Sequence, residues 1–378
     1  MTNSTRVLIS MLGDYHNDKG TRTKHEFLFQ FLEEEVEIIA IHNADLKGKQ
    51  RFWYMFQSIH PILSEWKTRY YLNVNAFKRR SIVEQQYIAE IAHNVDVILQ
   101  IGTLFSLANS SIPVVLYLDY TAALSIDKQK SGQAFRIPTQ AERWVSLERE
   151  VYQKAAHICV RSQNVRDSLV DSYQVSPDKI TIVGGGVNFN PLPDIASRNE
   201  KKPMDPCQIL FIGKDFNRKG GDLLLAAFEK VSVKHPEASL TMITNLPSGV
   251  KIPKGVSVQS PTWDRNKIAE VYANSDIFVL PSRLETWGDV LLEAMSFGLP
   301  CVGMKMDAME EIIQHQETGL IVPPNDVDKL ANAMIYLLDN PAVRRQYGLN
   351  GRNRIENKFN WEFTAIQIAN ILNHNRRS

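Results

Sequence analysis

Short runs of apolar, mostly β-branched residues alternate along this chain with stretches that repeat apolar positions at helical spacing. Runs that are apolar at every position predict strands buried on both faces, as in a parallel sheet covered by helical crossovers. In the first half the predicted strands are residues 7–11, 36–41, 95–101, 114–118, 157–160 and 180–183. In the second half they are residues 208–212, 239–244, 256–259, 277–280, 300–303 and 320–322.

The alternation stops once, near residue 190, where the string NPLPDIASRNEKKPMDP is rich in proline and charge. We therefore expect an α/β protein with two doubly wound domains, residues 1–190 and 207–357, joined by a linker at 191–206. Such sheets bind ligands beyond the carboxyl ends of their strands, so two facing domains would enclose a cleft. A last helix is expected near residues 362–372, within the segment 358–378.

Composition narrows the classes of partner and location. The 378 residues include 44% hydrophobic and 22% charged residues, which is the balance of a soluble protein with real cores. A net charge of +1 gives no reason to expect a nucleic acid as partner. Cys159, Cys207 and Cys301 are far apart and odd in number, so they predict neither a metal site nor a disulfide framework. With no signal peptide and no bilayer-spanning run, we expect a cytoplasmic protein, bound at most to the inner membrane face.

One segment carries a carboxylate before a predicted helix start and another within that helix. The string PSRLETWGDVLLEAMSFGLPCV, residues 281–302, predicts a helix from about residue 289 to residue 297. Gly288 would let the backbone approach a ligand, and the N–H groups of the first helical turn suit phosphate oxygens. Glu285 and Glu293 can each accept two hydrogen bonds from a vicinal diol, as in a sugar or ribose. Their spacing alone is common and also fits a capped helix with two solvated acids.

A second loop carries cations at the carboxyl end of a predicted strand. In ILFIGKDFNRKGG, residues 209–221, the side chains of Lys214, Arg218 and Lys219 precede a helix that Gly220 and Gly221 open. Cations in this place suit a diphosphate that must leave with negative charge. A solvated basic loop is the alternative interpretation.

The two strings together resemble the donor-site motifs of retaining glycosyltransferase family 4, whose fold is GT-B, two Rossmann-like domains facing across a cleft. The first string is similar to the family's Glu-x-Phe-Gly-x4-Glu, with a Trp in place of the Phe. The resemblance implies that Glu285 contacts the transferred sugar and that Glu293 holds the ribose. The other residues that it implies around the donor are Lys214, Thr286, Trp287, Gly288, Asp289 and Val290.

The second string is similar to the family's Gly-Arg-x4-Lys-Gly, with Lys219 on the family's Lys and Lys214 in place of its Arg. That replacement loses bidentate pairing, and Arg218 is a candidate to compensate for it. The resemblance thus implies catalysis by Glu285, Arg218 and Lys219, retention at the anomeric carbon, and no bound metal or other cofactor. It also implies that the segment 358–378 crosses back onto the first domain. Asp326, at a helix start, is predicted to cap that helix rather than to bind a metal.

The first domain departs further from the family. Asp119 ends a predicted strand where many members have a His, and it is a candidate catalytic carboxylate or else a cap of the next turn. Gly20 and Arg22, after the first strand, and Gly185, in ITIVGGGVN, are candidates on the acceptor side. The family's usual Gly-Gly is Asp307-Ala308 here, so the sugar is not identified.

Residues 47–80 combine eight Lys or Arg and eight aromatic residues with one acid, Glu65. Three interpretations stay open for this segment. It can lie on an anionic membrane surface, line an acceptor pocket by stacking aromatic faces on sugar rings, or pack its aromatic residues in the core.

Taken together, these features predict a hexosyltransferase that uses a UDP, GDP or other nucleotide diphosphate sugar. The expected acceptor is a hydroxyl group of a glycan, lipid-linked or other cell-envelope molecule. Two alternatives from other classes remain. One is a glycoside hydrolase or phosphorylase on the same fold, of which a hydrolase would need a general acid and a second carboxylate flanking the bond. The other is a non-catalytic sugar-nucleotide-binding protein, which would bind without turnover. The base, the sugar, the acceptor and the oligomeric state stay undetermined.

Overall fold

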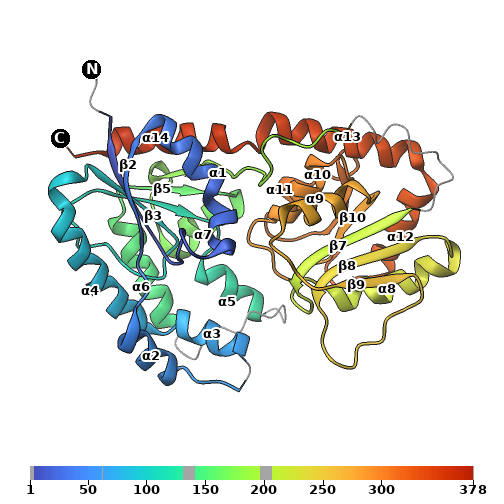
Figure 1. Ribbon diagram of the computed structural model, residues 1–378, viewed down its shortest axis with the longest axis horizontal. Helices are drawn as coiled ribbons and strands as arrows, with labels where there is room; N and C mark the ends of the chain where they lie inside the picture. The colour runs from blue at the N-terminus through green and yellow to red at the C-terminus, as the bar shows by residue number, and fades with distance from the viewer. Residues whose placement is uncertain (1–3, 62, 131–140, 196–206, 378) are drawn as a thin grey trace. The chain divides into compact units, whose positions relative to one another are not determined.

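The computed structural model describes residues 4–61, 63–130, 141–195 and 207–377, and Figure 1 shows its ribbon. The chain divides into two compact units, Met1–Gly185 with Trp361–Ser378, and Gly186–Asn360. Most of the expected linker, residues 196–206, lies outside the described residues.

The first unit is built on a six-stranded sheet of parallel strands in the order β2-β1-β3-β4-β5-β6. Its strands are β1 (Arg6–Met11), β2 (Glu37–Asn43), β3 (Val97–Ile101), β4 (Val114–Leu118), β5 (His157–Val160) and β6 (Ile180–Ile182). Both faces of β1 are buried, because Val7 and Ile9 enter one apolar cluster while Leu8 enters another. Burial on both sides explains why these strands are apolar at nearly every position.

Helices cover both faces of this first sheet. The helices of the first unit are α1 (Lys19–Glu35), α2 (Gly48–Gln57), α3 (Leu63–Tyr71), α4 (Val74–Ile91), α5 (Ala122–Lys130), α6 (Ala141–Lys154), α7 (Gln163–Tyr173) and α14 (Trp361–Asn375), with 3-10 turns η1 (Ala92–Asn94) and η2 (Pro177–Lys179). α1 and α14 contribute to the cluster on one face, and α4, α6 and α7 contribute to the cluster on the other. The C-terminal helix α14 is thus part of the first unit, although the second unit precedes it in the chain.

The second unit repeats the architecture with a parallel sheet in the order β12-β11-β10-β7-β8-β9. Its strands are β7 (Gln208–Asp215), β8 (Ser239–Asn245), β9 (Val256–Gln259), β10 (Ile277–Leu280), β11 (Cys301–Met304) and β12 (Gly319–Val322). Its helices are α8 (Gly221–Lys234), α9 (Arg265–Ala273), α10 (Asp289–Ser296), α11 (Met309–Ile312), α12 (Val327–Asp339) and α13 (Pro341–Lys358). Asp326 caps α12 by accepting from the backbone N–H of Lys329 at 2.9 Å, which confirms its predicted role.

Candidate donor site in the second unit

The loops after β7 and β10 carry the two predicted motifs, and the structure brings them together. β7 and β10 are parallel neighbours, so both loops leave the same edge of the sheet. The backbone N–H of Arg283 donates to the carbonyl oxygen of Arg218 at 2.8 Å and joins the loops directly. The guanidinium of Arg283 adds two bonds of 2.7 Å to the carboxylate of Asp222 in the first turn of α8. This bidentate pair fixes the two loops against each other.

Glycines at the start of α8 allow close packing, between the two loops at Gly220 and within the β7 loop at Gly221. Gly220 has a φ of 73°, and a Cβ there would lie 1.9 Å from the carbonyl oxygen of Pro281. A Cβ at Gly221 would lie 2.4 Å from the ring of Phe216. The start of α8 can therefore touch the end of β10 because Gly220 lacks a side chain, and Gly221 leaves room for the ring of Phe216 within the β7 loop itself. The contact between Gly220 and Pro281 brings the side chain of Lys219 close to that of Glu285.

Lys219 and Glu285 form an ion pair whose side chains are only 12% and 6% exposed. The same Glu285 oxygen accepts from the hydroxyl of Ser282 at 3.1 Å. The backbone N–H of Glu285 donates to the carboxylate of Asp307 at 3.0 Å. Burial lowers the pKa of the Lys219 ammonium, and the nearby Glu285 carboxylate opposes that shift. The alternatives of a solvated acid and a solvated basic loop are therefore wrong for this pair.

The two other cations of the β7 loop differ in their surroundings. Arg218 is half-buried, donates to the carbonyl oxygen of Leu284 at 3.0 Å, and lies 3.6 Å from the carboxylate of Asp215. Its guanidinium thus holds the backbone just before Glu285. Lys214 is exposed at the end of β7.

Glu293 is 5% exposed and has a partner on each oxygen. Arg265 donates to one oxygen at 2.9 Å, and the hydroxyl of Tyr272 donates to the other at 3.1 Å. Burial raises the pKa of the Glu293 carboxyl, and the guanidinium of Arg265 opposes the shift. Arg265 also donates to the carbonyl oxygen of Asn188 at 2.9 Å and lies 4.0 Å from the ring centroid of Phe189. Arg265 and Tyr272 lie in no motif, and the one signal for them is that a buried carboxylate requires partners.

Gly288 begins α10 with a φ of 105° and brings no side-chain acceptor to the helix cap. The first turn therefore has no side-chain cap on its N–H groups, which favours an anion, while the carboxylate of Asp289 in that turn opposes one. The predicted donor-side residues that are half-buried around this turn are Thr286, Asp289 and Val290.

Trp287 lies inside the second unit rather than on its surface. Its side chain is 2% exposed and belongs to the apolar cluster of that unit. The ring packs edge-on against Phe359, with centroids 5.9 Å apart. Trp287 thus anchors the donor loop in the apolar core of the second unit.

Asp119, the candidate carboxylate of the first unit, is exposed directly after β4. The cap of the following helix α5 is made by another residue, since the hydroxyl of Thr121 accepts from the backbone N–H of Leu124 at 3.4 Å. The structure therefore gives no sign of the capping role that was the alternative for Asp119.

The remaining acceptor-side candidates are also in the first unit. Arg22 is exposed and donates to the carbonyl oxygens of Tyr15 and His16, so it ties down the loop ahead of α1. Gly20, in the first turn of α1, and Gly185 are both buried. The chemical role of these three positions stays a prediction.

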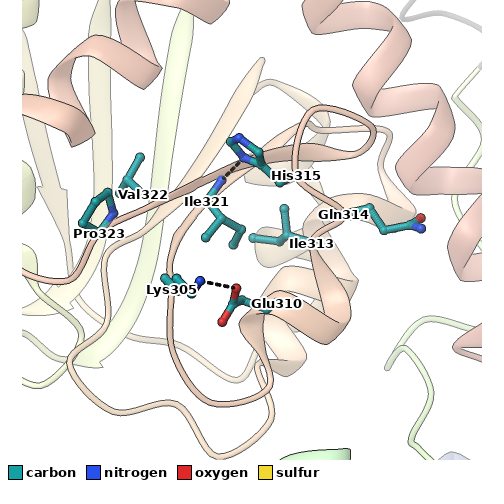
Figure 2. A pocket seen from close by; sticks show the side chains of 8 residues that line it. All are labelled: Lys305, Glu310, Ile313, Gln314, His315, Ile321, Val322 and Pro323. Carbon is teal, nitrogen blue, oxygen red and sulfur yellow. Dashed lines mark hydrogen bonds and ion pairs between the residues drawn. The ribbon is translucent and has the colours of Figure 1, made fainter.

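A pocket of about 350 Å³ lies at the ends of β11 and β12, and Figure 2 shows its lining. Lys305 and Glu310 form an ion pair of 3.8 Å there, and Nδ1 of His315 accepts from the backbone N–H of Ile321 at 3.0 Å. Lys305 follows β11 and Pro323 follows β12, so part of the lining comes from the same edge of the sheet as the donor loops. No motif in the sequence pointed to it.

Two parallel six-stranded sheets with flanking helices define the GT-B fold. Sucrose-phosphate synthase from Thermosynechococcus elongatus has the same fold, with a TM-score of 0.69, 18% identity and 98% of each chain covered. HepE from Anabaena, solved in complex with UDP-glucose, matches with a TM-score of 0.67 and 14% identity over 98% of this chain and 99% of that chain. At these identities the solved structures establish the fold alone.

Residues 194–354 match the family described as Glycosyl transferases group 1. Among curated relatives, D-inositol 3-phosphate glycosyltransferase from Corynebacterium efficiens is 26% identical over 282 residues, which cover 69% of this chain and 65% of that relative. The chain thus spans less than two thirds of the length of this relative.

Proposed function

We propose that this protein is a retaining hexosyltransferase that moves a hexosyl unit from a nucleotide diphosphate sugar to a hydroxyl group. The observation that carries the proposal is the buried pair of Lys219 and Glu285, in the segment that matches the group 1 family. A cation and a carboxylate side by side suit a substrate that presents a phosphate next to sugar hydroxyls.

In the proposed reaction, the bond between the anomeric carbon and the diphosphate oxygen breaks and a bond to the acceptor oxygen forms on the same face. Lys219, Arg218 and the N-terminus of α10 stabilise the departing diphosphate. Glu285 orients the sugar and stabilises the positive charge that develops on it. The acceptor proton passes to the leaving phosphate. Because these groups supply the charge stabilisation, we propose that no bound metal is required.

Glu293 is proposed to hold the ribose of the donor. Both of its oxygens already accept one hydrogen bond, from Arg265 and Tyr272. A carboxylate oxygen has a second lone pair, so each can also accept a ribose hydroxyl. The same two partners oppose the effect of burial on the pKa of the carboxyl and hold it in one orientation.

UDP-hexoses are the first donors that we propose, because HepE was solved with UDP-glucose; GDP sugars come next. We propose a glycan or a lipid-linked or other cell-envelope molecule as acceptor. The cytoplasm and the inner face of the membrane are the proposed location, which agrees with the three buried free cysteines.

A panel of UDP, GDP, ADP and dTDP sugars tests the donor site by thermal shift. A donor at roughly 100 times its dissociation constant should stabilise the protein by about 2.7 kcal/mol, which raises the melting temperature by several degrees. If no sugar nucleotide raises it, the donor site is refuted. The reaction is then followed by release of the nucleoside diphosphate and by NMR of the product anomer. Release without an acceptor supports a hydrolase, and binding without turnover supports a binding protein.

A further inference from the structure

The outer face of helix α2 is strongly apolar, the reverse of an ordinary surface helix. None of its residues is buried, and Phe52, Trp53 and Phe56 are 73%, 57% and 57% exposed. The spacing of these three residues places them on one side of the helix. Tyr54 and Met55 point to the other side, where they pack against the small apolar cluster of Leu46, Tyr70 and Ala76. The core interpretation of the aromatic segment is therefore wrong for the three outer residues.

The exposed apolar surface continues past the end of α2. Ile59 is 61% exposed and Leu63 is 71% exposed. We call Phe52, Trp53, Phe56, Ile59 and Leu63 the α2 patch. Helix α2 is anchored to α3, since the indole N–H of Trp66 donates to the carbonyl oxygen of Met55 at 2.5 Å. In Figure 1, α2 lies at the lower margin of the first unit. A run of large apolar side chains exposed on an anchored helix marks an interaction surface.

Three cations, Lys47, Lys49 and Arg51, lie at the N-terminal end of α2, and α2 itself contains no acid. Lys47 and Lys49 are exposed, and neither has an ion-pair partner among the residues that the structure describes. Arg51, with a side chain 45% exposed, lies 3.7 Å from the carboxylate of Asp45 and is partly neutralised by it. Aromatic side chains bordered by lysines fit the headgroup layer of an anionic bilayer, where rings enter the boundary and ammonium groups meet phosphates.

We propose that the α2 patch docks this protein on the surface of an anionic phospholipid bilayer, with Phe52, Trp53 and Phe56 seated among the lipid headgroups. The inference does not depend on the proposed transfer reaction, because it rests on the exposure and charge of the first unit alone. Of the helices that the structure describes, none has the length and apolar character to cross a bilayer.

Co-sedimentation of the full chain with vesicles tests this proposal. We expect binding to mixed phosphatidylcholine and phosphatidylglycerol vesicles, weaker binding to phosphatidylcholine alone, and release by high salt. The triple variant Phe52→Ser, Trp53→Ser, Phe56→Ser should lower the partition coefficient roughly tenfold or more. Lys47→Gln with Lys49→Gln should lower it by about fivefold for each charge.

The matched control is the double variant Val233→Ser, Phe363→Ser, which removes apolar side chains that are 85% and 61% exposed outside the patch. It should bind as the wild type does. All variants alter exposed positions, so we expect them to fold as the wild type does. An unchanged melting temperature will establish this. The proposal is overturned if the wild type stays in the supernatant, if the triple variant still sediments, or if the control loses as much binding. A wild-type dimer that the triple variant dissociates, without vesicle binding, would assign the patch to a second copy and also overturn it.

Discussion

Replacing Arg265 by Met removes the cation that faces the buried Glu293 carboxylate and leaves Tyr272 as its remaining recorded donor. Breaking a buried ion pair costs about 3–5 kcal/mol. Since the Arg265 side chain is 31% exposed, and the Met stem can still cover Phe189, the loss should be smaller. We expect the free energy of unfolding of the second unit to fall by about 2 kcal/mol at neutral pH. For a unit of this size, its melting temperature should drop by roughly 4–8 °C.

The loss should depend on pH with a definite sign. Burial raises the pKa of Glu293 above its ordinary value, so the folded chain keeps a proton at pH values where the unfolded chain has lost it. Stability therefore falls as the pH rises through that window. Without Arg265 the folded-state pKa rises further and the window widens. The stability that Arg265→Met loses relative to the wild type should be largest above the folded-state pKa of Glu293 in the variant. It should shrink as the solution is acidified.

Urea unfolding of the wild type, Arg265→Met, Glu293→Gln and the double variant, between about pH 5 and about pH 8, measures this effect. The double variant has no buried charge, so it should be more stable than Arg265→Met alone at the higher pH, with a clear coupling energy. The reasoning is refuted if the deficit of Arg265→Met is the same at both pH values, or if adding Glu293→Gln restores nothing.

Gly220→Ala should cost roughly 3 kcal/mol in urea unfolding and Gly249→Ala about 1 kcal/mol, since both have a positive φ but only Gly220 faces a carbonyl oxygen. Equal losses would contradict the close contact of α8 with β10. Glu285→Gln should lower kcat by about 10²–10³-fold, with little change in the calorimetric dissociation constant of the nucleoside diphosphate; an unchanged kcat would remove Glu285 from the catalytic residues. Burial and the Arg161 guanidinium lower the pKa of His25 to about 3, so below about pH 6.5 only the unfolded chain takes up that proton. Stability should fall by about 2 kcal/mol from about pH 6.5 to about pH 5; His25→Gln should flatten this fall, and an equal slope in the variant would show that His25 is not its source.

The alternation of apolar runs was sufficient to predict the strands, because a parallel sheet buried on both faces leaves almost no polar position. Each of the twelve predicted strands overlaps an observed one, and the helix expected near residues 362–372 is observed as Trp361–Asn375. The order of strands could not be predicted in the same way, since it depends on contacts between distant segments. Residues 47–80 were ambiguous because α2 turns its aromatic face outward, so its apolar pattern does not mark a core.

The candidate donor site was predictable where motif and topology agree. Lys219 and Glu285 are 66 positions apart in the chain, and they meet because the strands ahead of them are neighbours. The partners that fix the carboxylates were not predictable. Arg265 contacts Glu293, and Asp307 accepts from the backbone of Glu285, through positions that no local pattern connects. Which residues contact the two carboxylates is determined only when the whole second unit has folded.

Helix α14 also determines the order in which the units can be completed during synthesis. Its residues Trp361, Ala365 and Leu372 are at most 3% exposed and fill one face of the first sheet together with α1. A nascent chain that ends at residue 360 contains all six strands of that sheet and the whole second unit, but it lacks this cover. The second unit can therefore finish folding near the ribosome while the first still exposes an apolar face, which is a substrate for chaperones. The first unit, whose strands are synthesised first, is therefore the last to complete its fold.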